Sequence, residues 1–205
     1  MPCCLTKLGS CGIFMAEDFR IKERTIMEFK ELIEARRSIR AYAENVTVTA
    51  DDIKSMISAA QQAPSWKNSQ TGRYYAVISP EMIAKVQSEC LPEFNQNNSR
   101  NAGALIVAAY VANRSGFDRD GNPTNECGNE WGAYDLGLQN QNLLLAARDS
   151  GFDTLIMGIR DAEKLCEMLG IPEDQHVMSV IAVGKRAAEP QKPERKNTED
   201  IVKMF

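Results

Sequence analysis

An uninterrupted apolar run, Ala104–Ala112, constrains the fold more than any other feature of this chain. The run falls short of the roughly 18–20 residues that a membrane span needs, but it has the length of a strand. No polar residue alternates with the apolar ones, so a strand here must be covered on both faces. The rest of the chain must therefore supply neighbouring strands and two flanking layers, which indicates a layered α+β or α/β architecture.

Helices and strands are expected to be mixed along the chain. A helix beginning at Thr49 has a pattern like a capping box, with Asp52 three residues later. The segment Trp131–Ser150 has an apolar stripe at helical spacing and is followed by Gly151, which favours a long helix ending there. We expect further helices at Pro80–Cys90 and Asp161–Leu169, further strands at Arg73–Ile78, Thr154–Met157 and Val177–Val183, and a loop at Ser115–Asn129.

Length and composition indicate one domain. The chain has 205 residues, of which 43% are hydrophobic, and this suffices for a core without disulfides or structural metal. Residues 27–205 are expected to form this domain, beginning with a helix at Met27–Arg36 whose Phe29, Leu32 and Ile33 share one face. Residues 1–26 are expected to be an extension outside the core, with Met27 as an alternative start. The other interpretation is a cysteine-based redox or anchoring tail.

Charge and cysteine spacing exclude several classes of function. The net charge of -4 and pI of about 5.2 argue against binding to nucleic acid or a membrane surface, because both favour a basic face. The 6 cysteines form no C-x-x-C pair and there is 1 histidine, so no zinc site is expected. Reduced, widely spaced thiols indicate a cytoplasmic protein.

Common catalytic motifs are also missing. The sequence has no P-loop, no Rossmann G-x-G-x-x-G and no G-x-S-x-G. His176 begins a predicted strand, so we expect it to be structural or on the surface and not part of a Ser-His-Asp triad. Asp118 and Asp120 resemble the start of a calcium loop. However, Pro123 stands where that loop needs glycine, so a solvated turn is expected.

Three polar or basic clusters remain, and the first follows the first predicted helix. It contains Arg36, Arg37, Ser38 and Arg40 within five residues. Guanidinium groups bind phosphate in a bidentate manner, and a serine hydroxyl adds a donor, so the cluster indicates an anion site. Cations are also favourable at a helix C-terminus, and the cluster alone does not separate these interpretations.

The other two clusters are less specific when taken alone. Ala63–Gln70 follows the second predicted helix and reads A-P-S-W-K-N-S-Q. Asparagine and glutamine amides both donate and accept hydrogen bonds, as the edge of a heterocycle such as a flavin requires, and Trp66 can stack on a planar ring. A plain turn before the next strand is the simpler interpretation. Lys192–Lys196 lies in a polar tail, where cations are usually solvated.

Together, in their order and spacing, these segments resemble the nitroreductase family of flavoproteins. RRSIRAY is similar to the family's R-x-S-x-R/K opening, and APSWKNSQ to its A-P-S-x-x-N-x-Q segment. YDLGLQNQNLLLAARDSGFDTLIMG resembles its long central helix and glycine-ended flavin loop, and VGKRAAEPQKPERK its last strand and basic segment. The resemblance runs from about Glu28 to Val202 and is far more specific than any single motif.

The resemblance implies an α+β fold with a central, mainly antiparallel sheet flanked by helices. It also implies an obligate homodimer with two FMN molecules at its interface. Arg36 and Ser38 match positions that hold the FMN phosphate, with Arg37 adjoining them, and Arg195 matches the late phosphate-binding arginine. Arg40 matches the cation beside flavin N1 and O2.

Other positions match the surroundings of the flavin ring. The segment that the other subunit lays against the ring is matched by Pro64, Ser65, Trp66 and Asn68. The backbone near flavin N5 is matched by Leu155, Ile156, Met157 and Gly158, and the pyrimidine edge by Asn95. Departures are Thr71-Gly72 where the family often has Pro-Trp, Trp66 in place of a second serine, and Met157 where some members are acidic. The first two bear on the substrate and not on flavin binding.

The resemblance implies an enzyme that uses NADH or NADPH to reduce nitroaromatics, quinones or related small acceptors by ping-pong hydride transfer. The flavin carries the chemistry, so no catalytic residue beyond it and no metal are expected. Alternatives are dehalogenation, enone reduction or flavin destruction on the same scaffold, a flavin-binding or storage protein with little turnover, and an anion-binding module without flavin. The sequence leaves the substrate and the choice between NADH and NADPH open.

Overall fold

The computed structural model describes residues 27–205, so the expectations about the preceding extension fall outside the described residues. Its centre is a sheet of β1 (Gly72–Val77), β2 (Ala104–Val111), β3 (Asp153–Met157) and β4 (Gln175–Gly184). The strand order is β1-β2-β4-β3, and every neighbouring pair is antiparallel. The expected mainly antiparallel α+β sheet is therefore confirmed, with β2 and β4 as its inner strands.

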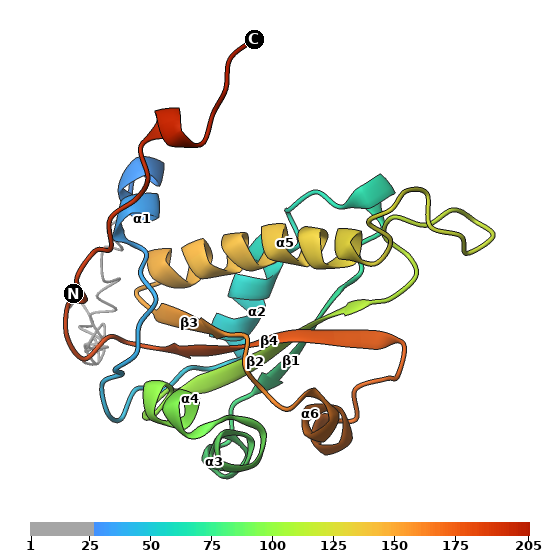
Figure 1. Cartoon of the computed structure of the whole chain (residues 1–205). Coiled ribbons are helices and arrows are strands. Elements are labelled where there is room, and N and C mark those ends of the chain that lie inside the picture. Colours follow the sequence, from blue (N-terminus) through green and yellow to red (C-terminus); the bar gives the residue numbers. More distant parts are fainter. Residues whose placement is uncertain (1–26) are drawn as a thin grey trace, which may run out of the picture.

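Helices cover both faces of this sheet (Figure 1). Helices α2 (Ala50–Ala60) and α5 (Glu130–Asp149) lie on one face. On the other face lie α3 (Pro80–Cys90), α4 (Glu93–Asn98) and α6 (Ala162–Leu169). The remaining elements are α1 (Phe29–Ala35) and two 3-10 turns, η1 (Trp66–Asn68) and η2 (Thr198–Asp200).

Strand β2 connects the two helical layers through its alternating side chains. Leu105 and Val107 belong to the core beneath α3 and α6, whereas Ile106 and Ala108 belong to the core beneath α2 and α5. All four side chains are completely buried. The apolar run is thus a two-sided central strand, as its lack of alternation predicts.

Local signals place several helix ends where the sequence predicts them. The Thr49 side chain accepts a hydrogen bond from the Asp52 amide at 3.2 Å, and the Asp52 carboxylate accepts from the Thr49 amide at 2.9 Å. This reciprocal pair is the expected capping box at the start of α2. The bounds of α3 agree with the prediction, and Gly170 ends α6 with a left-handed φ of 64°.

Two features differ from the sequence-based expectations. Helix α4 was not predicted, because its segment has no apolar periodicity. The predicted helix α1 does form, but Phe29 is 69% exposed and Ile33 45% exposed, so these two side chains join neither hydrophobic core of the described residues. The C-terminal arm after β4 runs away from the sheet and exposes Met204 and Phe205 (Figure 1). No helix among residues 27–205 combines the length and apolarity that membrane crossing demands.

Leu143→Ala tests the packing of α5 on α2 and the sheet. Leu143 is completely buried in the same core as Met56, so the truncation should lower the free energy of unfolding by about 2–5 kcal/mol. Lys54→Ala on the exposed side of α2 is the control and should change it by less than about 1 kcal/mol. Urea unfolding followed by circular dichroism measures both. Equal effects of the two variants would refute this packing.

Candidate functional site

The first basic cluster lies along the free edge of β3. After α1 the chain is extended, and Ser38 forms an isolated parallel bridge with Thr154. The Ile39 amide donates to the Thr154 carbonyl at 3.0 Å, and the Ile39 side chain is buried. Arg36 is the C-cap of α1, so the helix-terminus interpretation extends to Arg36 alone. Arg37 and Arg40 lie beyond the helix, in a segment fixed beside the predicted flavin loop.

Three arginines of this region repel one another. The pKa of Arg36 is lowered below its usual value, first by burial and then by the positive charges of Arg37 and Arg195. Because Arg195 acts on Arg36, the third cluster lies close to the first, although the two are far apart in the sequence. None of these arginines has a carboxylate partner among residues 27–205. Such an uncompensated positive site favours a multiply charged anion.

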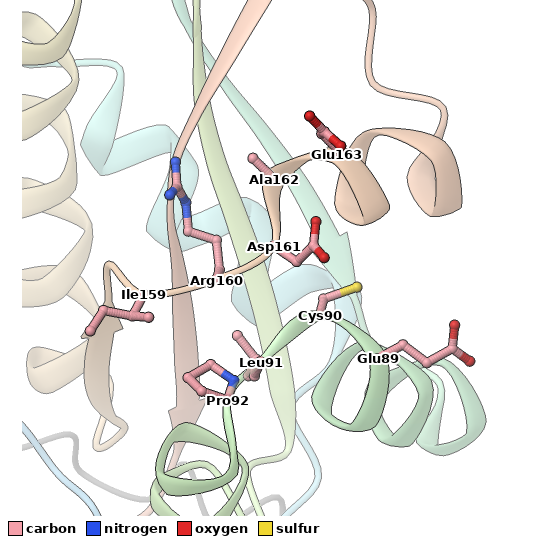
Figure 2. A pocket seen from close by; sticks show the side chains of 9 residues that line it. All are labelled: Glu89, Cys90, Leu91, Pro92, Ile159, Arg160, Asp161, Ala162 and Glu163. Carbon is pink, nitrogen blue, oxygen red and sulfur yellow. The ribbon is translucent and has the colours of Figure 1, made fainter.

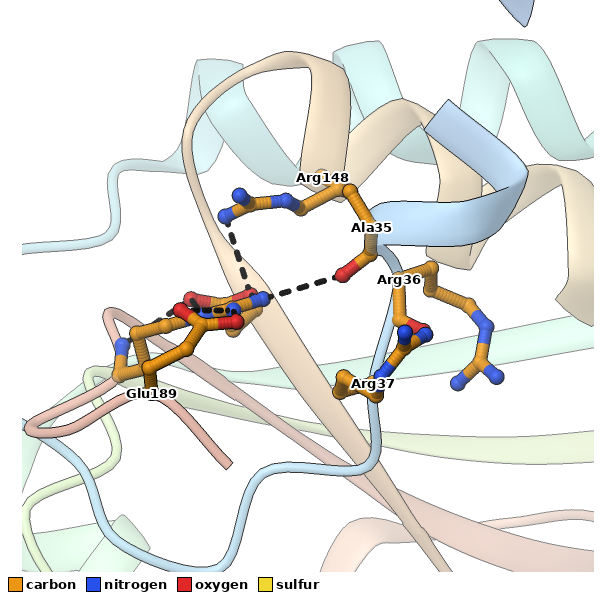
Figure 3. A network of polar contacts seen from close by, with 7 residues as sticks. Ala35, Arg36, Arg37, Arg148 and Glu189 are labelled. Carbon is orange, nitrogen blue, oxygen red and sulfur yellow. Dashed lines mark hydrogen bonds and ion pairs between the residues drawn. The ribbon is translucent and has the colours of Figure 1, made fainter. Parts of the chain in front are cut away.

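A buried ion-pair network connects the start of the arginine segment to the core (Figure 3). Asp153, at the start of β3, is 4% exposed and accepts from Arg186 at 2.6 and 3.0 Å. Arg148, near the end of α5, lies 3.3 Å from the same carboxylate. Arg186 also donates to the Ala35 carbonyl at 3.4 Å, in the residue directly before Arg36. The network therefore ties the end of α1 to β3, β4 and α5.

Arg186 differs from the three unpaired arginines because its charge is balanced. Hydrogen bonding to Asp153 raises its pKa above the usual value, burial opposes this, and Glu189 raises it further. Sequence analysis missed both Asp153 and Arg186. The sequence does contain one signal for this network: Asp153 directly precedes the predicted strand Thr154–Met157, and a buried charge there requires a partner.

Asn95 lies against the segment that follows β3. Its side chain is 5% exposed, and its Nδ2 donates to the Ile159 carbonyl at 2.8 Å. Its Oδ1 has no partner among the described residues, so one acceptor remains available. Ile156 and Ile159 are exposed beside the backbone of Gly158. Asn95 and the predicted N5 segment, Leu155, Ile156, Met157 and Gly158, are therefore brought together.

A cavity of about 620 Å³ lies between residues 89–92 and 159–163, which Figure 2 shows facing one another. Its charged lining consists of Glu89, Asp161 and Glu163 against Arg160. The Arg160 guanidinium already donates to the Val177 carbonyl. A net negative lining makes this cavity a poor site for phosphate.

The second cluster forms a tight loop around η1. The Trp66 amide donates to the buried Asp135 carboxylate at 2.9 Å, and its ring packs on Trp131 with centroids 4.6 Å apart. The Ser65 hydroxyl accepts from the Gln70 amide at 3.0 Å. The Trp66 ring thus contacts a protein ring here, at an interplanar angle of 51°. Pro64 and Asn68 are exposed.

One chain does not bring the first and second clusters together. Trp131 and Asp135 hold the second cluster near the start of α5, whereas Arg148 joins the network of the first near its end. At 1.5 Å per residue, the 20 residues of α5 span about 30 Å. The two clusters therefore lie at opposite ends of one helix (Figure 1).

His176 and Asp118, for which no catalytic or metal-binding role was expected, are also placed by the structure. His176 is exposed, and its Nδ1 is 3.0 Å from the Tyr110 hydroxyl. Asp118 accepts from the Asp120 and Asn122 amides at 2.9 and 2.8 Å, so the expected turn is confirmed.

Comparison with known proteins matches residues 33–185 to the profile of the Nitroreductase family. A protein from Archaeoglobus fulgidus, named as an inferred NADH dehydrogenase/NAD(P)H nitroreductase, is 34% identical and covers 77% of this chain and 84% of its own length. A CLA biosynthesis enone reductase from Lactiplantibacillus plantarum is 29% identical, covering 76% and 84%. An inferred nitroreductase from Exiguobacterium sibiricum, solved with FMN, has a TM-score of 0.72 at 23% identity, covering 87% and 98%.

Asp153→Asn tests the network behind the arginine cluster. The change leaves Arg186 buried with Glu189 as its remaining carboxylate, so the free energy of unfolding should fall by about 3 kcal/mol. Glu189→Gln is the matched control, since this side chain is 75% exposed and the pair should contribute less than about 1 kcal/mol. Thermal and urea unfolding measure both. An Asp153→Asn protein as stable as the control would show that the network does not hold this segment.

Proposed function

The chain belongs to the nitroreductase family, and from this we propose that it is an FMN-dependent NAD(P)H oxidoreductase working as a homodimer. The observation that carries the proposal is the group of Arg36, Arg37 and Arg195, which concentrates positive charge without a carboxylate partner among the described residues. A cofactor with a terminal phosphate supplies the missing negative charge. FMN ends in such a phosphate, whereas the phosphates of FAD are internal.

The residues present fit the two ends of FMN. A phosphate monoester carries roughly -1.5 to -2 charges, which three arginines can balance, and the exposed Ser38 adds a hydroxyl donor. At the ring end, the free Oδ1 of Asn95 suits the N–H of the pyrimidine edge. When bound, FMN supplies the redox chemistry by taking hydride from NAD(P)H and passing it to an acceptor.

The remaining roles follow from charge and position. Arg40 is exposed and its only recorded bond among residues 27–205 is a 3.4 Å contact to the Ser38 carbonyl, so its charge is available at the ring. A fixed cation there favours the build-up of negative charge on the pyrimidine. The backbone of Leu155, Ile156, Met157 and Gly158 would border the reacting edge. Exposed Ile156 and Ile159 would exclude water from it.

The homodimer proposal rests on what a single chain leaves incomplete. Pro64, Ser65, Trp66 and Asn68 would complete the flavin site, yet they lie at the opposite end of α5 from the arginines. A second copy of the chain would supply these residues without a conformational change in either copy. The exposed apolar faces of α1 and of the C-terminal arm also need cover.

Enone reduction is a second candidate reaction on the same site. The specific support is the relative from Lactiplantibacillus plantarum, whose name describes an enone reductase. Trp66 and Thr71-Gly72, which depart from the family pattern, lie in the segment where the substrate is expected. An acceptor screen that compares nitroaromatics, quinones and enones at equal concentration separates these activities.

The proposal also includes a cytoplasmic location. Cys90, Cys127 and Cys166 are free thiols. Reducing compartments keep thiols in this state, and the negative net charge suits no nucleic-acid partner.

Turnover tests the function directly. The purified protein should be yellow and release FMN on heating, and NADH or NADPH should bleach it in an anaerobic cuvette. If donor and acceptor use the same flavin face in turn, double-reciprocal plots at several acceptor concentrations should be parallel. Bleaching without turnover would favour a flavin-binding or storage protein. A colourless protein that FMN does not reconstitute would overturn the proposal.

Arg36→Ala tests the phosphate site. Removing a charged donor should weaken FMN binding by roughly 1.5–3 kcal/mol, measured by titrating the apoprotein with FMN. Lys85→Ala, an exposed cation on α3, is the control and should leave the affinity unchanged. Because riboflavin has no phosphate, its affinity should hardly respond to Arg36→Ala. Parallel losses for FMN and riboflavin would contradict the assignment.

A further inference from the structure

A second positive site lies beside the η1 loop, at the other end of α5 from the arginine cluster. It is a hollow of about 770 Å³ between residues 67–69 and the loop 113–121. Its charged lining consists of Lys67, Arg114 and Arg119 against Asp118. A net positive hollow in a chain of net charge -4 requires an explanation.

The three cations of this hollow have no carboxylate partner among residues 27–205, and Lys67 contacts only the Trp66 ring, at 5.9 Å from its centre. Asp118 forms no ion pair with them, since its Oδ1 accepts from the amides of Asp120 and Asn122, and its single charge is outnumbered by the three cations. These bonds, led by the Asn122 amide, hold the pKa of Asp118 below its usual value. The Asp118 carboxylate thus stabilises the turn in which it lies, and the cations remain available to bind an anion.

Buried Asp135 brings the two halves of the hollow together. Its Oδ2 accepts from the Trp66 amide at 2.9 Å and from the Ser115 hydroxyl at 2.5 Å. Lys67 and Arg114 are the residues directly next to these donors. One carboxylate of α5, itself 2% exposed, therefore sets the spacing between a lysine of one loop and an arginine of another.

The η1 loop also has the character of a ligand site. Lys67 and Asn68 have φ values of 47° and 55°, which cost about 1 kcal/mol or more for residues other than glycine. Ser69 is among the residues that line the hollow, and its hydroxyl is buried without a hydrogen-bond partner among residues 27–205. A strained backbone and an unpartnered donor are retained where a bound acceptor completes the site.

We propose that this hollow binds a phosphate group of the nicotinamide nucleotide. This rests on the proposed function, in which Asn68 borders the flavin and the nicotinamide must reach the same place. The chain has no Rossmann fingerprint, so other residues must hold the phosphates of the nucleotide. Two arginines and a lysine around Asn68 provide the charged donors that a phosphate requires, and the unpartnered hydroxyl of Ser69 lies next to them. The group is either the pyrophosphate common to both nucleotides or the 2′-phosphate of NADPH.

Binding without turnover is the first test. Both tryptophans of the chain, Trp66 and Trp131, pack together, and the Lys67 Nζ lies 5.9 Å from the Trp66 ring centre. Titration of the FMN-loaded protein with adenosine 2′,5′-bisphosphate or inorganic pyrophosphate should change tryptophan fluorescence. Arg114→Gln combined with Arg119→Gln should weaken this binding roughly tenfold or more. Lys54→Gln on α2 should not. Equal affinities of the double variant and the control would overturn the proposal.

Anaerobic reduction of the bound flavin identifies the phosphate. A loss confined to NADPH in the double variant supports the 2′-phosphate, and an equal loss with NADH and NADPH supports the pyrophosphate. Normal reduction by both nucleotides would refute the proposal while leaving the proposed function intact. The proposal would also be refuted if the double variant were slow only in the reoxidation of its flavin by a carboxylated nitrobenzene. If neither nucleotide reduces the wild-type protein, the proposed function itself fails.

Discussion

Helix α5 sets the distance between the two groups of polar residues that the proposed site needs. Its 20 residues pack with α2 on one face of the sheet, so its length and direction are fixed by a continuous core. The η1 loop is attached near its start and the arginine segment near its end. Because a packed helix cannot shorten, no loop movement within one chain brings the clusters together. This constraint, more than any single residue, makes a second copy necessary to the account.

A buried carboxylate lies near each end of α5: Asp135 within the helix and Asp153 at the start of β3. Asp153 pairs with Arg186 and Arg148, and Arg186 in turn donates to the Ala35 carbonyl, next to Arg36. Asp135 has no cationic partner among the described residues and binds the loops next to Lys67 and Arg114 by hydrogen bonds. In both cases a buried carboxylate fixes the segments that carry the surface cations. It forms no ion pair with those cations, which are Arg36 and Arg37 at one end and Lys67 and Arg114 at the other. The acidic chain thus has two positive sites, the one proposed for the cofactor and the one proposed for the nucleotide.

The sequence predicted most of the fold, because the signals were local. The apolar run of β2, the cap at Thr49 and the proline at the start of α3 each act over a few residues. Helix α4 has no such signal, since the side chain it buries is the polar Asn95. The candidate site was predicted in part for the same reason. The arginine cluster is contiguous, whereas its proximity to Arg195, the network of Asp153 and the hollow beside Lys67 arise only from tertiary contacts.

Flavin stoichiometry in a mixed dimer tests the central claim most directly. One chain carries Arg36→Ala, and the other, with a different tag, carries Asn68→Asp, which tolerates a positive φ and removes both amide donors. Each variant homodimer has two damaged sites. If every site combines the arginines of one chain with the η1 loop of the other, the purified heterodimer has one intact site and should bind one FMN with wild-type affinity. If both clusters of one chain serve the same site, each site in the heterodimer is damaged. FMN binding as weak as in the homodimers would then contradict the account.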